Sequence, residues 1–278
     1  MITFKYLYPI KTTEKESNYF NIEKKSIEVI TGEINNEDNS VATSVKKCLP
    51  MVNLLIEKAF KILKNNGRLF YIGSGTSGRL GILDASECLP TFGIENKIIG
   101  LIAGGDAAIR KSQEHAEDSM TNAWKDLLNY NIGQNDMVIG ISASGSTPFV
   151  LGGLISCKKN GITTGCITCN NDTKIAQNSD FPIEVIVGPE YISGSSRMKA
   201  GTAQKMILNM ISSTVMIKLG RVLDNKMIDM KLSNNKLHER AIRIVESILD
   251  IDKNIAKDLI YKYKNIRSAI ENYKSNDK

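Results

Sequence analysis

The chain has 278 residues, of which 24% are charged and 42% hydrophobic, and its formal net charge is +6. This composition is typical of a folded globular protein that can bury a full core. Its basic residues are scattered, which argues against nucleic-acid binding, and no apolar run reaches the ~18 residues of a membrane span. We therefore expect a cytoplasmic protein with no nucleic-acid partner and no membrane association.

The five cysteines are spread through the chain without the spacing of a disulfide framework. Cys166 and Cys169 form a lone C-x-x-C with no second cysteine pair and no nearby histidine. A zinc site needs more ligands than this motif supplies. We expect reduced thiols and no metal.

The N-terminal part predicts an irregular arm followed by helices. The arm covers residues 1 to about 20, a short helix follows near 22–30, and a turn is expected at 35–36. A long run over about 38–64 has apolar residues at helical spacing. Pro50 lies within this run and predicts a kink or a break.

The middle of the chain predicts an open α/β sheet. Short, nearly continuous apolar runs alternate with helix-like segments, which is typical of parallel strands that are buried on both faces. The expected strands are 69–72, 98–103, 137–141, 163–168 and 183–187. Ligands of such sheets bind beyond the carboxyl ends of the strands, so the loops that follow them are the candidate site.

The last third predicts a long helix over 195–219 and then a small bundle of about three more highly charged helices. Breaks in this bundle are expected near Ser233 and Asp250. The chain thus divides into N-terminal arm and helices over 1–55, a central α/β domain over 56–222 and a C-terminal bundle over 223–278.

The first strand is followed by a G-x-G-x-x-G loop at Gly73, Gly75 and Gly78. Glycines at these positions let backbone amides approach an anion at the start of a helix. A dinucleotide site would also need an acid at the end of the second strand, where the candidate, Asp106, comes late. The glycines alone leave a dinucleotide and a phosphate ester as alternatives.

Hydroxyl side chains favour the phosphate ester. The glycine loop carries several, and a second loop after the third strand, "SASGSTP", carries more just before another helix. One such loop is explained by helix capping and turn formation, whereas two at neighbouring strand ends suit the acceptor oxygens of one phosphate monoester. The expected substrate-binding residues are Gly73, Ser74, Gly75, Thr76, Ser77, Ser142, Ser144, Gly145, Ser146 and Thr147.

Two hydroxyl loops on a five-stranded parallel sheet resemble the sugar isomerase (SIS) domain. Within that group the sequence strongly resembles the N-acetylmuramic acid 6-phosphate etherase family, to which the glucokinase regulatory protein is related. The matching stretches are "INNED" (34–38), "GRLFYIGSGTSGRLGILDASECLPTFG" (67–93), "LIAGG" (101–105), "HAED" (115–118), "SASGSTP" (142–148), "GSSRMKAGTAQKMILNMIS" (194–212) and "ERAIRIV" (239–245). The family usually has alanine in place of Ser74 and proline in place of Leu89, but no departure removes a carboxylate.

The resemblance implies a lyase that cleaves the D-lactyl ether of N-acetylmuramic acid 6-phosphate by elimination and then hydration. The products would be N-acetylglucosamine 6-phosphate and D-lactate, formed in the catabolism or recycling of cell-wall amino sugars. The resemblance also implies a homodimer, with no metal or other cofactor. Removing the proton at C2 and protonating the leaving oxygen requires two carboxyl groups in opposite protonation states.

The match to the family assigns these two roles. Glu87 corresponds to the general acid that protonates the leaving lactate, and Glu117 corresponds to the general base at C2. Without the resemblance, each glutamate is explained as a solvated helix residue, and Glu114 and Asp118 are equally close candidates for the base.

Three basic residues near the loops are candidates either for phosphate binding or for ordinary surface and interface charges: Arg79, Arg197 and Lys199. Two other functions suit the same fold, an aldose–ketose isomerase and a sugar-phosphate sensor without turnover. An isomerase would not release lactate from the muramic sugar. Sensors of this kind are typically longer or carry a DNA-binding module, and no helix-turn-helix is evident ahead of the predicted sheet.

Overall fold

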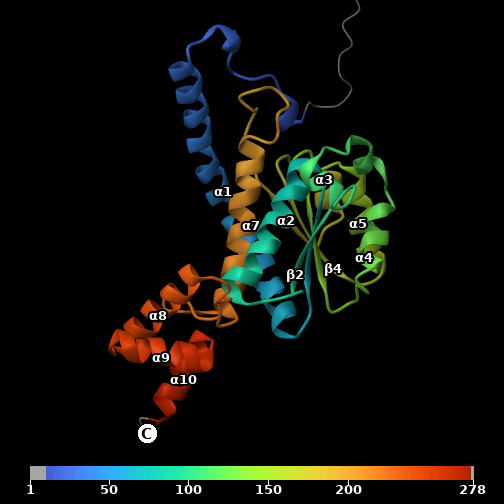
Figure 1. The fold of residues 1–278 in the computed structure, drawn as a ribbon. Helices are drawn as coiled ribbons and strands as arrows, with labels where there is room; N and C mark the ends of the chain where they lie inside the picture. Colours follow the sequence, from blue (N-terminus) through green and yellow to red (C-terminus); the bar gives the residue numbers. More distant parts are fainter. Residues whose placement is uncertain (1–10, 277–278) are drawn as a thin grey trace, which may run out of the picture.

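The computed structural model describes residues 11–276 and is built around a five-stranded parallel sheet with the strand order β2-β1-β3-β4-β5 (Figure 1). The strands are β1 (Leu69–Gly73), β2 (Ile98–Ile102), β3 (Met137–Ile141), β4 (Thr163–Thr168) and β5 (Phe181–Glu184). This confirms the predicted fold class, a parallel sheet with helices on both faces. Among the residues that the structure describes, no helix has the length and apolarity needed to cross a bilayer.

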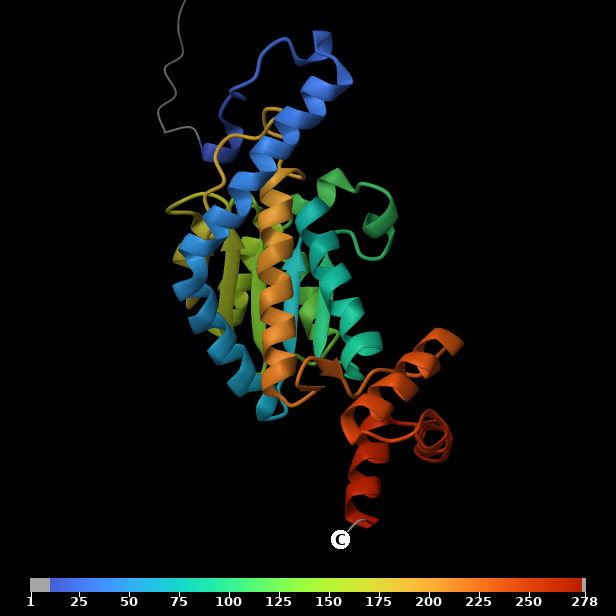
Figure 2. The ribbon, with the colours of Figure 1, turned by 90° about the vertical axis from the view of Figure 1, so that its left-hand side faces the viewer.

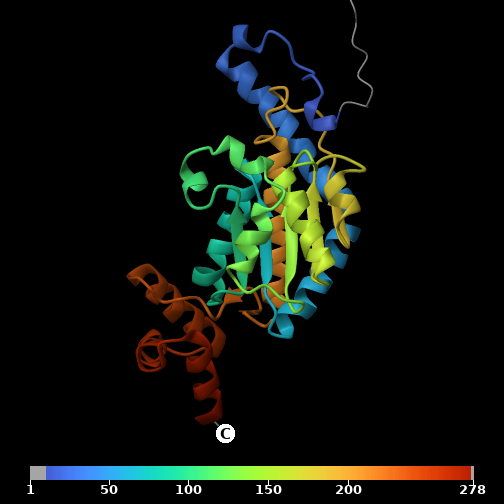
Figure 3. The ribbon, with the colours of Figure 1, turned by 90° about the vertical axis from the view of Figure 1, so that its right-hand side faces the viewer.

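Helices cover both faces of the sheet. Figure 2 shows α1 (Ile27–Lys64), α7 (Lys199–Lys218) and α2 (Gly75–Phe92) side by side on one face. Figure 3 shows the opposite face, where the helices are α5 (Pro148–Lys159), α4 (Asn122–Leu128) and the short α6 (Lys174–Gln177). The remaining short helices are η1 (Thr12–Glu14), η2 (Ile22–Lys24), α3 (Ala107–Arg110) and η3 (Glu114–Asp118).

The alternation of side chains along the central strands divides the core between these two layers. In β1, Tyr71 packs with the α1/α7/α2 layer, whereas Phe70 and Ile72 pack with the α4/α5 layer. In β3, Ile139 packs with the α1/α7/α2 layer and Val138 packs with the α4/α5 layer. Both faces are therefore buried, which is why these strands are nearly continuous apolar runs in the sequence.

The single helix α1 replaces several elements that the sequence predicts. It is continuous over 38 residues, so neither the turn at 35–36 nor the break at Pro50 is present, and the predicted domain boundary at 55/56 falls inside it. Pro50 is exposed, whereas Cys48 and Val52 beside it are buried against the core. The proline ring thus lies on the solvent side, and packing of the inner face outweighs the lost backbone hydrogen bond.

The C-terminal part is a three-helix bundle with a hydrophobic core of its own. It consists of α8 (Asn235–Leu249), α9 (Lys253–Tyr263) and α10 (Ile266–Asn276), in agreement with the predicted helix count and breaks. A small hairpin, β6 (Val222–Leu223) and β7 (Lys226–Met227), precedes it and was not expected from the sequence. The bundle lies at the end of the sheet where the strands begin (Figures 1 and 2).

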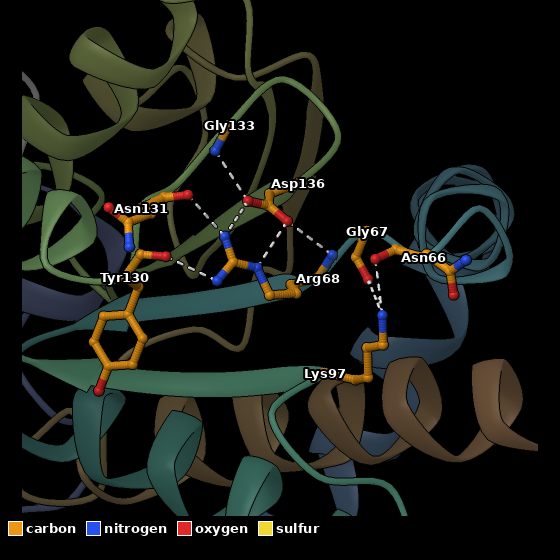
Figure 4. Close-up of polar contacts among 8 residues, drawn as sticks. All are labelled: Asn66, Gly67, Arg68, Lys97, Tyr130, Asn131, Gly133 and Asp136. Carbon is orange, nitrogen blue, oxygen red and sulfur yellow. Dashed lines mark hydrogen bonds and ion pairs between the residues drawn. The ribbon is translucent and has the colours of Figure 1, made fainter.

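An ion pair connects the starts of the two central strands (Figure 4). Arg68 directly precedes β1 and Asp136 directly precedes β3, and Arg68 Nη2 lies 2.7 Å from Asp136 Oδ2. The same guanidinium donates to the backbone carbonyls of Tyr130 at 2.8 Å and Asn131 at 3.0 Å. These contacts hold β1 and β3 in register at the end of the sheet opposite the candidate loops.

Candidate active site

The candidate site lies where the chain reverses its direction of travel across the sheet. Strand β1 has β2 on one side and β3 on the other, so the connections that leave β1 and β3 run to opposite sides. Such a switch point leaves a crevice at the carboxyl ends of the strands. The predicted glycine loop follows β1 and the predicted hydroxyl loop follows β3, and the structure therefore brings these two loops together as expected.

The glycine loop is shaped by close packing of β1 against the start of α2. A Cβ atom on Gly73 would lie 2.7 Å from the backbone nitrogen of Gly78, and Gly75 has φ of +51°. Only glycine fits the first position, and the second is in the left-handed region that glycine prefers. Helix α2 starts directly at this loop, so its free N–H groups and positive dipole end face the switch point.

One predicted catalytic residue, Glu117, lies at this loop. Its carboxylate accepts a hydrogen bond of 2.7 Å from the hydroxyl of Ser74. The two residues line a cavity of about 360 Å³ together with Gly75, Arg79, Ala103, Ala108, Ser112 and Gln113. The cavity thus joins the glycine loop to η3, which carries the carboxylate.

Arg79 holds the segment that leads to Glu117. Its Nη2 donates to the carbonyl of Ala108 at 2.8 Å and its Nε donates to the carbonyl of Ile109 at 3.0 Å. These bonds tie α2 to α3, just before η3 begins. Because two of its donors are engaged in this way, Arg79 positions the carboxylate segment in addition to supplying a positive charge to the cavity.

The second loop forms a cluster of hydroxyl groups. Ser142 Oγ lies 2.8 Å from Thr147 Oγ1 and 3.3 Å from Ser144 Oγ, which in turn lies 3.2 Å from Ser146 Oγ. Gly145 has φ of +68°, and a Cβ there would lie 2.3 Å from a methyl group of a neighbouring threonine. The four hydroxyls are linked in a chain of three hydrogen bonds, and their donors can reorient toward a phosphate.

The remaining hydroxyls of the glycine loop differ in where they point. Thr76 lies beside Gly201 of α7: a Cβ atom on Gly201 would be 3.4 Å from the methyl group of Thr76. Ser77 is buried and donates to the Oε1 atom of Gln204 at 2.9 Å. Gln204 is 1% exposed, and its amide nitrogen has no hydrogen-bond partner in the part of the chain that the structure describes. Gln204 was not among the predicted site residues, although it lies in the matched stretch 194–212.

The other two basic candidates lie at the start of α7. Lys199 is buried and forms an ion pair with Glu37 of α1, whereas Arg197 is exposed. Glu190 is also buried and accepts hydrogen bonds from the backbone nitrogens of Lys199 at 2.8 Å and Ala200 at 2.9 Å. Burial raises the pKa of Glu190, while these two bonds act in the opposite direction. The charge of Lys199 is therefore already paired within the chain.

Glu87 lies far from Glu117 within one chain. It is exposed on α2, twelve residues beyond Gly75, which corresponds to ~18 Å along the helix axis. It lines a different cavity of about 360 Å³ between α2 and α7, with Leu83, Asp84, Cys88, Thr91, Phe92, Lys205, Asn209, Ser212 and Ser213. A single chain does not bring the two predicted catalytic carboxylates to one site.

Asp84, one turn before Glu87, supports the structure around that residue. Its carboxylate accepts hydrogen bonds from the Tyr71 hydroxyl at 3.1 Å and from Ser212 of α7 at 2.9 Å. Burial raises the pKa of Asp84 to about 6, although both hydrogen bonds oppose the shift. Asp84 therefore ties α2 to β1 and α7.

Models of known protein families match both the α/β part of the chain and the C-terminal bundle. The model of the glucokinase regulatory protein N-terminal SIS domain matches residues 51–158, and the SIS domain model matches residues 116–213. The model of the C-terminal lid domain of glucokinase regulatory protein matches residues 224–276. A phosphoheptose isomerase structure from Francisella tularensis aligns with a TM-score of 0.54 at 14% identity, covering 69% of this chain and 98% of that one.

Curated relatives are much closer in sequence. The chain is 52% identical over 264 residues to the N-acetylmuramic acid 6-phosphate etherase of Christiangramia forsetii, covering 95% of this chain and 96% of the relative. It is likewise 52% identical over 266 residues to the enzyme of that name from Bacteroides thetaiotaomicron, again covering 95% and 96%. The chain therefore belongs to the N-acetylmuramic acid 6-phosphate etherase family.

Proposed function

We propose that this protein is a lyase that converts N-acetylmuramic acid 6-phosphate to N-acetylglucosamine 6-phosphate and D-lactate. The observation that carries the proposal is the carboxylate of Glu117, held at 2.7 Å by Ser74 beside the glycine loop, in a chain 52% identical to relatives with that name. The reaction places the protein in the catabolism or recycling of cell-wall amino sugars. The buried, free thiols of all five cysteines suit the reducing cytoplasm.

The two loops at the switch point account for binding of the 6-phosphate. The hydroxyl cluster of Ser142, Ser144, Ser146 and Thr147 offers four donors, and the backbone N–H groups at the start of α5 lie directly behind it. Phosphate oxygens accept several short hydrogen bonds, and a helix N-terminus favours negative charge. The open-chain sugar then extends toward the cavity of the glycine loop.

Glu117 is suited to removing the proton at C2 of the open-chain sugar. That proton lies α to the aldehyde, so its removal gives an enolate-type anion from which the C3 substituent can leave. The hydrogen bond from Ser74 fixes the orientation of the carboxylate. Loss of lactate requires a second group that protonates its ether oxygen, and water then adds at C3 of the unsaturated aldehyde.

We infer that Glu87 of the partner subunit supplies that proton in a homodimer. Within one chain Glu87 is ~18 Å along α2 from the glycine loop. Pairing two copies through the outer side of the α1/α7/α2 layer, with their α2 helices antiparallel about a two-fold axis, brings the end of one α2 to the start of the other. Exposed apolar residues on these helices support such pairing: Met51, Leu54, Leu83 and Ile217.

The activity is tested by incubating the protein with N-acetylmuramic acid 6-phosphate and measuring D-lactate. Release of lactate supports the lyase, whereas interconversion of an aldose and a ketose phosphate without lactate would support the isomerase. Glu117→Gln should abolish both lactate release and exchange of the C2 proton with deuterated water. Glu87→Gln should abolish lactate release but retain exchange, and the reverse pattern would mean that the two roles are exchanged.

A further inference from the structure

The N-terminal segment 11–19, here called the strap, lies across the loops at the carboxyl end of the sheet. In Figures 1, 2 and 3 it runs next to the loop that precedes α7. Thr13 is fully buried and exchanges two hydrogen bonds with Asn170, whose amide also donates to the carbonyl of Ala143 at 2.9 Å. Ser17 Oγ donates to the carbonyl of Tyr191 at 2.7 Å. The strap is thus built into the edge of the candidate site.

One strap residue reaches the hydroxyl loop itself. The ammonium of Lys11 donates to the backbone carbonyl of Ser144 at 2.9 Å, in the middle of the hydroxyl cluster. An ammonium has three donors, and among the side chains that the structure describes this is the one hydrogen bond that the Lys11 ammonium makes. No carboxylate whose side chain is described lies within ion-pair distance of it.

The surroundings of Lys11 favour an added anion. Partial burial lowers the pKa of Lys11, the nearby charge of Lys174 lowers it further, and Glu14 partly offsets these effects. Burial and a neighbouring cation both destabilise a charged ammonium, and an anion placed between the two cations would stabilise it. The hydroxyl loop 142–147 contains no carboxylate that could supply this charge.

We propose that Lys11 is a phosphate-binding residue whose ammonium pairs with the 6-phosphate held by the hydroxyl cluster, and that the strap is part of the substrate site. This inference rests on the proposed function of the hydroxyl loop. It assigns a role to a segment that the sequence analysis treated as an irregular arm. Its simpler rival is that Lys11 only fastens the strap to the carbonyl of Ser144.

The test compares Lys11→Gln and Lys11→Arg with Lys15→Gln, which removes an exposed charge from the same strap. Binding of N-acetylglucosamine 6-phosphate and of unphosphorylated N-acetylglucosamine is measured by calorimetry, together with KM and kcat for lactate release. For Lys11→Gln we expect binding of the phosphorylated sugar to weaken and KM to rise by roughly ten-fold, with kcat little changed, as for the loss of one charge-assisted contact. Lys11→Arg should retain most of the affinity, and Lys15→Gln should resemble the unaltered protein.

Two outcomes would overturn the inference. One is that Lys11→Gln binds the phosphorylated sugar as tightly as Lys15→Gln does. The other is that Lys11→Gln weakens the binding of both sugars by the same factor, because a purely structural fastening would not discriminate by phosphate. Sugar-phosphate binding is measured separately from lactate release. If the unaltered protein binds the phosphorylated sugar but releases no lactate, the lyase proposal is contradicted, whereas the comparison of Lys11→Gln with Lys15→Gln still tests the role of Lys11.

Discussion

Replacing Asp136 by alanine should destabilise the sheet strongly, because one carboxylate joins the starts of β1 and β3 (Figure 4). This carboxylate accepts hydrogen bonds from the backbone nitrogen of Arg68 at 2.9 Å, from its Nε at 3.1 Å and its Nη2 at 2.7 Å, and from the backbone nitrogen of Gly133 at 3.0 Å. The side chain of Asp136 is 6% exposed and that of Arg68 is 26% exposed. Alanine therefore leaves a mostly buried guanidinium and two backbone donors without this acceptor.

Removing one partner of a buried ion pair costs ~3–5 kcal/mol. Because water reaches part of Arg68, and its bonds to the carbonyls of Tyr130 and Asn131 remain, we expect a loss of ~3 kcal/mol in the free energy of unfolding. Asp136→Asn keeps the shape and part of the bonding and should lose ~1–2 kcal/mol.

Urea unfolding followed by circular dichroism measures these losses, with an unchanged m-value as evidence that the unfolding transition is comparable. Lys97→Gln is the matched control, because its ammonium donates to the carbonyl of Asn66 at 2.8 Å in an exposed contact at the same end of the sheet. It should cost less than ~1 kcal/mol. If Asp136→Ala costs no more than this control, the carboxylate does not hold the two strands as described.

Three further changes test the site and the packing around it. Gly145→Ala should raise KM at least ten-fold and lower stability, because the φ of +68° at this position disfavours a side chain and the added Cβ would lie 2.3 Å from a neighbouring atom. Gly133→Ala is the control, because a Cβ there meets nothing within 4 Å, and it should change neither KM nor stability appreciably. Arg79→Ala should lower kcat by roughly 10- to 100-fold with unchanged circular dichroism, because Glu117 loses its fixed position; an unchanged kcat would contradict this positioning role. Burial raises the pKa of Asp84 from 3.8 to about 6, so the folded state holds its proton where the unfolded state has lost it, and stability from this group falls as pH rises from about 4 to about 6. Asp84→Asn should remove that decline in urea titrations across this pH range, and an identical pH dependence in both proteins would contradict it.

The central strands were predicted well because burial on both faces leaves a clear mark in the sequence. The predicted ranges 137–141 and 163–168 coincide with β3 and β4. Strand β5 was expected at 183–187 but spans Phe181–Glu184, because its pairing with β4 stops where β4 ends at Thr168. Val185 and Val187, which follow Glu184, are buried without being in the sheet, and apolarity alone does not distinguish a buried strand residue from a buried loop residue.

The elements that were not predicted depend on contacts between distant parts of the chain. Pro50 weakens a helix locally, and the continuous α1 follows from packing of its inner face against α7. Gln204 lies behind the glycine loop because α7 packs beside α2, 127 positions away from Ser77 in sequence. Lys11 reaches the hydroxyl loop across 133 positions. No spacing rule within a short window connects such pairs.

The two loops could be located from the sequence because glycine and hydroxyl patterns are local, and parallel strands place their carboxyl ends at one edge. The arrangement of the two glutamates could not. Glu87 and Glu117 each belong to a stretch that matches the family, yet the length of α2 separates them within one chain. The length of that helix is the reason why we propose that the two glutamates meet across two subunits.

Complementation between inactive variants tests this shared site most directly. Glu87→Gln and Glu117→Gln proteins are each expected to release no lactate. If each site combines Glu117 of one chain with Glu87 of the partner subunit, a mixed dimer contains one intact site and one doubly altered site. Unfolding and refolding the two variants together in equal amounts should then restore about a quarter of the unaltered activity, because about half of the dimers are mixed and each has one of two sites. A mixture that stays inactive while the mixed dimer is shown to form would contradict the shared site.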